Sequence, residues 1–276
     1  MIVGNKVFES GHTYVMGILN VTPDSFSDGG KFNVLDNALR HIEEMINDGA
    51  DIIDIGGEST RPGYERIGEQ EEIERIAPVF EAAAKRFDIP FSIDTYKPEV
   101  AGEAVKLGAL LINDIWGLKG ENLTFPDSGM AKVIADSGVA CCIMHNRNLV
   151  ENELTGSDIV SSVISDLTES LEIASKYGIP DDKILLDPGI GFGKTYEENI
   201  ACIKHLEEIC KAFEYPMLLG TSRKSVIGLT LNLDKSERME GTLATTARAV
   251  ESGCMFVRVH DVKENARFIK MLEAVR

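Results

Sequence analysis

The sequence predicts a single-domain α/β fold, a (β/α)8 TIM barrel, and three features of its 276 residues carry that prediction. Short apolar runs alternate with longer segments of helical period, and the alternation persists to the C-terminus. The runs are apolar throughout, as expected for parallel strands that are covered on both faces. No Ser/Gly-rich or Pro-rich linker divides the chain, so we expect residues 1–276 to form one domain of a size usual for such barrels.

Eight apolar runs are the expected strands, and in chain order they span 14–19, 52–55, 91–93, 110–112, 139–144, 184–186, 216–219 and 255–259. Between them, apolar residues recur every three or four positions, which is typical of amphipathic helices. This period is clearest over 39–46, 164–174, 200–213 and 262–272. Residues 2–10 are expected to add a short N-terminal strand or a lid. A doubly wound open sheet is the main alternative fold, because it alternates strands and helices in the same way.

The composition excludes several classes of protein. The chain has 28 Lys and Arg against 45 Asp and Glu, a net charge of −17, which argues against nucleic acid as a partner. Its five cysteines form no C-x-x-C pair, which favours reduced thiols over a disulfide framework or a zinc site. No apolar run has the length of a membrane helix, and the N-terminus lacks the apolar region of a signal peptide. We therefore expect a cytoplasmic protein without a membrane partner.

Polar side chains follow every expected strand. Asp94, Asn113 and Asp187 stand directly at the ends of the third, fourth and sixth strands, where barrel side chains point into the mouth. Helix capping explains single residues of this kind but not three at strand ends. A buried carboxylate is costly unless it is paired or hydrogen-bonded, so these groups call for donors on a ligand. The pattern predicts a pocket for a molecule rich in N–H groups.

Positive charge gathers after the last two strands, where barrels often bind phosphate. Ser222, Arg223 and Lys224 follow the seventh strand, and Arg258 and His260 lie at the end of the eighth. We expect Lys224 and Arg258 to be functional, because both fall where the chain leaves a strand at the mouth.

The glycines of 189–193 suggest a nucleotide loop, but that interpretation fails. A phosphate-binding P-loop needs glycine at position 188, which is Pro188, and the dinucleotide fingerprint needs one at position 194, which is Lys194. We therefore expect a tight turn that lets a ring or another backbone segment approach closely.

Several segments resemble the signatures of one enzyme family, the dihydropteroate synthases, in order along nearly the whole chain. They are 16–30 (MGILNVTPDSFSDGG), 54–63 (DIGGESTRPG), 92–95 (SIDT), 112–114 (IND), 187–194 (DPGIGFGK), 222–225 (SRKS) and 258–261 (RVHD). The resemblance implies a barrel that condenses 6-hydroxymethyl-7,8-dihydropterin diphosphate with p-aminobenzoate to give 7,8-dihydropteroate and diphosphate. It also implies Mg²⁺ as cofactor, competition by sulfonamides, and a homodimer formed through the late helices.

The resemblance also implies a role for each matched residue. Those expected to bind the pterin are Asp94, Asn113, Asp187, Lys224 and Arg258. Those expected to bind the diphosphate are Asn20, which would also coordinate Mg²⁺, with Thr60, Arg61, Arg258 and His260. Those expected to frame p-aminobenzoate are Phe26, Pro62, Phe192, Lys224 and Ser225. The residues expected to take part in catalysis are Asn20, Asp94, Lys224 and Arg258.

Because the dihydropterin can delocalise a methylene cation, we expect a Mg²⁺-assisted, SN1-like loss of diphosphate. An arylamine that attacks a cation needs no general base, so the protein would mainly position the substrates and stabilise charge. Two alternatives from other classes are a catalytically silent pterin-binding paralogue and a pterin-dependent methyltransferase that serves a cobalamin protein. The cationic residues at the mouth argue against the methyltransferase, which has no diphosphate to bind.

Overall fold

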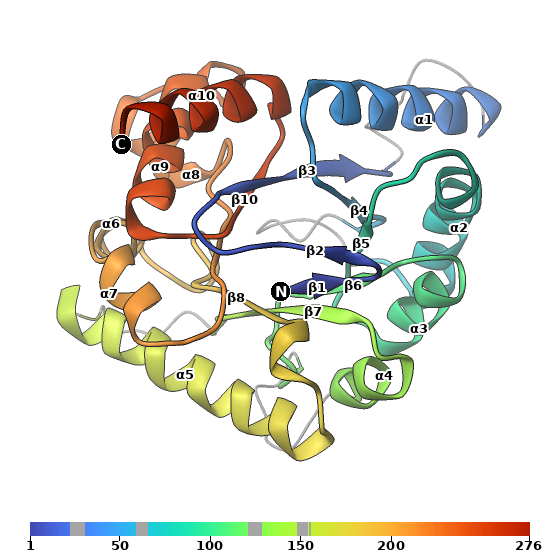
Figure 1. Cartoon of the computed structure of the whole chain (residues 1–276), viewed down its shortest axis with the longest axis horizontal. Helices are drawn as coiled ribbons and strands as arrows, with labels where there is room; N and C mark the ends of the chain where they lie inside the picture. Colours follow the sequence, from blue (N-terminus) through green and yellow to red (C-terminus); the bar gives the residue numbers. More distant parts are fainter. Residues whose placement is uncertain (23–30, 59–65, 121–128, 148–153, 155) are drawn as a thin grey trace.

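Eight parallel strands form the centre of the molecule (Figure 1). The computed structural model describes residues 1–22, 31–58, 66–120, 129–147, 154 and 156–276. The order of the strands in the sheet is β8-β7-β6-β5-β4-β3-β10-β9. Their bounds are β3 Tyr14–Asn20, β4 Ile52–Gly56, β5 Phe91–Asp94, β6 Leu111–Asp114, β7 Ala140–Met144, β8 Ile184–Asp187, β9 Leu218–Leu219 and β10 Phe256–Val259.

The two ends of this sheet meet and close it into a barrel. Leu186 of β8 pairs with Met217 through an isolated parallel bridge, and its N–H donates to the carbonyl of Pro216 at 2.9 Å. The predicted (β/α)8 barrel is confirmed, and the doubly wound alternative is wrong because an open sheet leaves its edges apart.

Helices surround the barrel, as Figure 1 shows. Their bounds are α1 Lys31–Asp48, α2 Glu69–Arg86, α3 Pro98–Lys106, α4 Met130–Ser137, α5 Gly156–Tyr177, α6 Tyr196–Lys204, α7 Leu206–Lys211, α8 Ser225–Leu231, α9 Met239–Ser252 and α10 Val262–Val275, with 3₁₀ turns at Asp181–Lys183 and Lys235–Glu237. The single helical segment expected over 200–213 is wrong in one detail, because α6 and α7 are separated at His205. The apolar period runs through this break because Cys202 and Leu206, on either side of it, are both buried.

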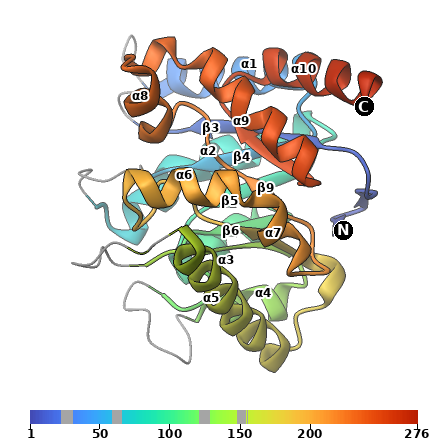
Figure 2. The ribbon, with the colours of Figure 1, turned by 90° about the vertical axis from the view of Figure 1, so that its left-hand side faces the viewer.

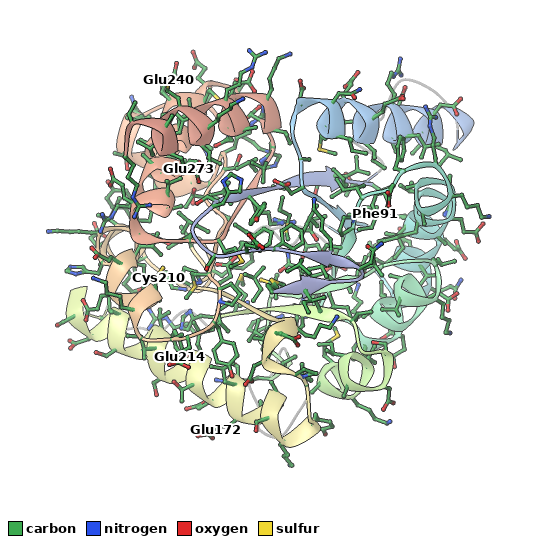
Figure 3. The ribbon with its side chains drawn as sticks, viewed as in Figure 1. Phe91, Glu172, Cys210, Glu214, Glu240 and Glu273 are labelled. Atoms are coloured by element: carbon green, nitrogen blue, oxygen red, sulfur yellow. The ribbon has the colours of Figure 1, made fainter. Side chains whose placement is uncertain are left out.

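The strands are apolar on both faces because each face has its own core. In β3, Val15 and Leu19 belong to the core between the strands and the helices, whereas Met16 belongs to a second core inside the barrel. Phe91 of β5 packs against Phe80 of α2 with ring centroids 6.4 Å apart (Figure 3). Exposed acidic side chains such as Glu172 lie on the outer faces of the helices. Among the described helices, none has the length and apolarity that crossing a membrane requires.

The N-terminal residues form a two-stranded antiparallel sheet from β1, Ile2–Val3, and β2, Lys6–Val7. Val3 and Phe8 are buried against the inner core, so this hairpin closes the amino end of the barrel. Figure 2 shows it at the end opposite α8. Of the two alternatives expected for residues 2–10, a short strand or a lid, the structure shows strands, two of them, paired with each other. The mouth is left to the loops that follow the strands.

Candidate active site

Arg258 organises the carboxyl mouth of the barrel. Its Nε donates to Oδ2 of Asp54 on β4 at 2.6 Å, and its Nη2 donates to Oδ2 of Asp94 on β5 at 2.5 Å. The Nδ2 of Asn113, whose backbone pairs with that of Asp94, donates to the same oxygen of Asp54 at 3.1 Å. The guanidinium therefore spans two carboxylates, which holds its plane in one orientation.

The donors that reach the carboxylates at the mouth do not satisfy all of their oxygen atoms. Burial raises the pKa of Asp94 to about 7, the charge of Arg258 opposes that shift, and the charge of Asp54 adds to it. Burial also raises the pKa of Asp187, against the charge of Lys224. Within the described part of the chain, Oδ1 of Asp94 and Oδ1 of Asp54 are buried without a hydrogen-bond partner. Such atoms are rare in folded proteins and indicate a missing donor.

The turn after β8 places Asp187 and requires glycine. Oδ1 of Asp187 accepts a hydrogen bond from the N–H of Gly189 at 2.7 Å. Gly189 and Gly193 have φ angles of +69° and +56°, and a Cβ there would lie 1.8 Å from the carbonyl oxygen of His145 and 1.9 Å from that of Arg147. The tight turn expected over 189–193 is confirmed, and it is the loop after β7 that approaches it closely.

The buried side chain of Lys194 supports this turn through hydrogen bonds. Nζ of Lys194 donates to the carbonyl of Gly189 at 2.8 Å and lies 2.6 Å from Nδ1 of His145. Burial lowers the pKa of Lys194 to about 7, and burial with the charge of Lys194 lowers the pKa of His145 to about 4. His145 is therefore neutral near pH 7, with Nδ1 as the acceptor and Nε2 at 3.0 Å from Oδ2 of Asp166.

Lys224 extends over this turn from the other side of the mouth. Its Nζ donates to the carbonyl of Ile190 and lies 4.7 Å from the ring centroid of Phe192, a cation–π contact. The next residue, Ser225, is exposed at the start of α8. Three residues that were predicted to share a subsite therefore lie together.

His260 and Arg223 belong to the rim after β9 and β10. Nδ1 of His260 lies 3.0 Å from Oγ of Ser222, which also accepts from the backbone N–H of His260 at 3.2 Å. Arg223 forms a two-point ion pair with Asp261, in which its Nε donates to Oδ2 at 2.9 Å. Arg223 also lines the cavity, and its charge is paired with that of Asp261.

These groups surround a cavity of about 420 Å³, within the range of small-molecule sites. The predicted site residues that line it are Asn20, Asp94, Phe192, Lys224, Ser225, Arg258 and His260. Asn113 and Asp187 are each 5% exposed and are not in its lining. Four predicted residues, Phe26, Thr60, Arg61 and Pro62, lie outside the described residues.

Sequence reasoning missed Asp54, which is fully buried and bound to both Arg258 and Asn113. A signal existed, because this carboxylate interrupts the otherwise apolar run of β4. It also missed Lys97, whose Nζ donates to Oε2 of Glu58 at 2.6 Å and to Oε2 of Glu72 at 2.7 Å. No sequence signal marked this buried cluster, because its members come from three separate segments.

The protein groups near the cavity offer few metal ligands. Over the described ranges, no cluster of three or more His, Cys, Asp or Glu side chains could hold a metal ion. The amide oxygen of Asn20 at the end of β3 is a hard neutral donor in the cavity lining. One such donor suits Mg²⁺, which keeps several waters and is commonly bound through substrate phosphates.

Comparisons with known proteins agree with this geometry. The model of the family described as "Pterin binding enzyme" matches residues 16–260. The dihydropteroate synthase of Clostridium beijerinckii is 55% identical over 277 aligned positions, covering 100% of this chain and 99% of that protein.

Solved structures show the same likeness. The structure of the Clostridium difficile dihydropteroate synthase in the presence of pteroic acid is similar with a TM-score of 0.90 and 48% identity, covering 98% of this chain and 99% of the other. The Yersinia pestis dihydropteroate synthase in a sulfonamide complex has a TM-score of 0.89 and 41% identity, covering 100% and 98% of the two chains. With a family match over most of its length and this level of identity, the chain belongs to the dihydropteroate synthase family of pterin-binding enzymes.

Proposed function

We propose that this chain condenses 6-hydroxymethyl-7,8-dihydropterin diphosphate with p-aminobenzoate, releasing 7,8-dihydropteroate and diphosphate. The observation that carries the proposal is the group of buried carboxylates around Arg258. Oδ1 of Asp94, which has no partner within the described residues, belongs to a side chain that lines the cavity. A pterin presents adjacent ring N–H and amino donors, which match carboxylate acceptors with charge-assisted hydrogen bonds.

The pterin would be bound by Asp94, Asn113, Asp187, Lys224 and Arg258. Nδ2 of Asn113 donates one N–H to Asp54, so Asn113 can offer the pterin its amide oxygen and its second N–H. Asp187 retains its second oxygen for the amidine-like edge of the pterin, because only Oδ1 accepts from Gly189. The plane of Arg258, held between two carboxylates, suits stacking on the flat heterocycle.

The diphosphate would be bound by Arg258 and His260 together with Asn20, Thr60 and Arg61. We assign Mg²⁺ to the same end of the cavity, with Asn20 as its protein ligand and diphosphate oxygens and water as the others. When bound, Mg²⁺ supplies neutralisation of the charge that grows on the departing diphosphate. The cationic side chains act in the same direction, which favours an SN1-like loss of the leaving group.

The p-aminobenzoate would be framed by Phe192, Lys224 and Ser225, together with Phe26 and Pro62. Phe192 offers an aromatic face, and Lys224 and Ser225 offer donors for a carboxylate. The related Yersinia pestis enzyme has been solved as a complex with a sulfonamide drug. We therefore expect sulfamethoxazole to compete with p-aminobenzoate here.

We further propose a cytoplasmic homodimer. Large apolar side chains are exposed on α8 and α10, namely Leu229, Leu231, Met271 and Val275, which supports a second copy as their partner. All five cysteines are free thiols, which supports a reducing compartment. Sedimentation velocity on the wild-type protein and on the double variant Leu229→Ser, Met271→Ser tests the dimer. A wild-type monomer would contradict it.

The reaction is tested by measuring diphosphate release from purified protein given the pterin diphosphate, p-aminobenzoate and Mg²⁺, with each omitted in turn. We expect release that depends on p-aminobenzoate and yields dihydropteroate. Asp94→Asn should lower kcat/KM at least roughly a hundredfold, because a buried charge-assisted contact is lost. Asp136→Asn, which changes an exposed carboxylate paired with Lys132, should leave it unchanged.

Other outcomes would overturn the proposal. Pterin binding without turnover would indicate a silent pterin-binding protein. Methyl transfer from a methylated pterin to a cobalamin protein would indicate a methyltransferase instead.

A further inference from the structure

One guanidinium that lines the cavity, but that the sequence did not single out, ties together both ends of α8. Arg238 follows the 3₁₀ turn Lys235–Glu237 and precedes α9. Its Nη1 donates to the carbonyl oxygens of Arg223 at 3.0 Å and Lys224 at 3.2 Å, which precede α8. Its Nε and Nη2 donate to the carbonyl oxygen of Leu233 at 3.2 and 3.1 Å, just beyond the end of α8. A single side chain thus satisfies three backbone acceptors.

The turn that Arg238 holds is strained and carries Lys224. Arg223 has a φ of +58°, in the left-handed region that bulky residues rarely adopt. Such a conformation persists only when its surroundings fix it. Here the side chain of Arg223 is fixed by Asp261, and its carbonyl is fixed by Arg238. The position of Lys224 over Phe192 depends on this turn.

The packing makes room for the guanidinium by means of a glycine. A Cβ at Gly228 would lie 2.1 Å from Nη2 of Arg238 and 2.2 Å from its Cζ. Gly228 is buried in the middle of α8 with ordinary helical backbone, so an alanine there would be compatible with the helix but not with the arginine. The sequence therefore provides a second, independent way to displace the same group.

We propose that Arg238 is a positioning residue that fixes Lys224 and the start of α8 at the mouth of the cavity. The proposal rests on the proposed function for its kinetic consequence, because Lys224 is assigned there to both substrates and Ser225 to p-aminobenzoate. Its structural content is independent of that function: without Arg238, the turn at 223–224 relaxes and the ammonium of Lys224 leaves the carbonyl of Ile190. Displacement of a substrate-positioning group by about 1 Å commonly lowers rates by about a hundredfold.

The test uses Arg238→Met and Gly228→Ala, with Arg248→Met as the matched control. Arg248 also binds backbone carbonyls, those of Ile203 and Lys204, but it lies away from the cavity lining. Acetylation of Lys224 by limiting acetic anhydride, measured by peptide mass spectrometry, reports the freedom of its ammonium in the absence of substrates. We expect at least a threefold faster reaction in both test variants and wild-type behaviour in the control.

Kinetics provides the second measurement. The KM for p-aminobenzoate should rise about tenfold or more in both test variants. The equilibrium affinity for the pterin should fall as well, because Lys224 is also assigned to the pterin, and both quantities should stay at the wild-type value in Arg248→Met. Circular dichroism confirms that each variant is folded, and Gly228→Ala serves if Arg238→Met is not. Unchanged labelling of Lys224 in a folded variant would overturn the inference. A wild-type protein without turnover would overturn the proposed function instead, and the labelling would still decide the role of Arg238.

Discussion

Replacement of Arg258 by lysine separates the charge of this residue from its shape. The guanidinium reaches Asp54 through Nε at 2.6 Å and Asp94 through Nη2 at 2.5 Å, two different nitrogens of one plane. A lysine retains the positive charge but presents one nitrogen and no flat face. The variant therefore loses at least one charge-assisted hydrogen bond and the stacking surface.

The magnitude follows from those two losses. A hydrogen bond to a charged partner contributes about 1.5–3 kcal/mol, and cation–π stacking adds about 0.5–1 kcal/mol. Because the Arg258 side chain is only 18% exposed, solvent screening reduces these figures little. A total of about 2–4 kcal/mol corresponds to a decrease of roughly 30- to 900-fold in kcat/KM for the pterin diphosphate.

Steady-state diphosphate release at saturating p-aminobenzoate is the assay. Arg86→Lys is the matched control, because Arg86 pairs with Glu43 on the surface with both side chains half exposed, and its replacement should not change kcat/KM. If Arg258→Lys kept kcat/KM within threefold of the wild-type value, the two-carboxylate geometry would have no part in transition-state binding.

Four further changes test other parts of the structure. In urea unfolding, Gly189→Ala should lower the free energy of unfolding by roughly 3 kcal/mol more than Gly178→Ala. Both glycines have a positive φ, but only a Cβ at Gly189 would meet a carbonyl oxygen, at 1.8 Å. Equal decreases in the free energy of unfolding would contradict this. The pKa of buried His145 is lowered to about 4, so the unfolded chain takes up its proton first and stability falls as pH decreases from about 6.5 towards 4, by up to about 3 kcal/mol. His145→Gln should flatten that part of the curve, and a slope equal to the wild-type slope would refute the assignment. The pKa of Asp94 is raised to about 7, so the pterin affinity measured by calorimetry should fall about tenfold per pH unit as the pH decreases below 7. Asp94→Asn should abolish this pH dependence. A wild-type affinity that stays constant from pH 8.5 to 6 would count against the role of Asp94. Asn20→Ala should raise several-fold the Mg²⁺ concentration that gives half the maximal rate, and an unchanged Mg²⁺ titration would remove Asn20 from the metal site.

The strands were predictable because barrel packing imposes a simple local rule on them. A parallel strand with cores on both faces is apolar at most positions, and β3 shows this with Val15 and Met16 facing different cores. The polar residues at strand ends were predictable for a related reason. The carboxyl ends of all the strands lie at the same end of the barrel. Asp94 and Asn113 therefore become neighbours in register once their strands pair.

The details that failed depend on contacts between distant segments. The helical period through His205 hides the break between α6 and α7, because the residues on both sides still face the core. Lys97 binds two glutamates that are 39 and 25 positions away, and no local sequence pattern predicts such a cluster. Asp54 was visible as a carboxylate in an apolar strand, but its partner Arg258 is 204 positions away.

The sequence by itself thus determined the barrel, the end of the barrel that carries the site and the chemical types of the site residues. Those properties follow from local periodicity and from the common direction of parallel strands. Only the tertiary structure decided which donor meets which acceptor: that Arg258 is held between Asp54 and Asp94, and that Arg238 holds the turn before α8. The reason is physical, because hydrogen bonds and ion pairs act over about 3 Å in space, a distance that sequence separation does not encode.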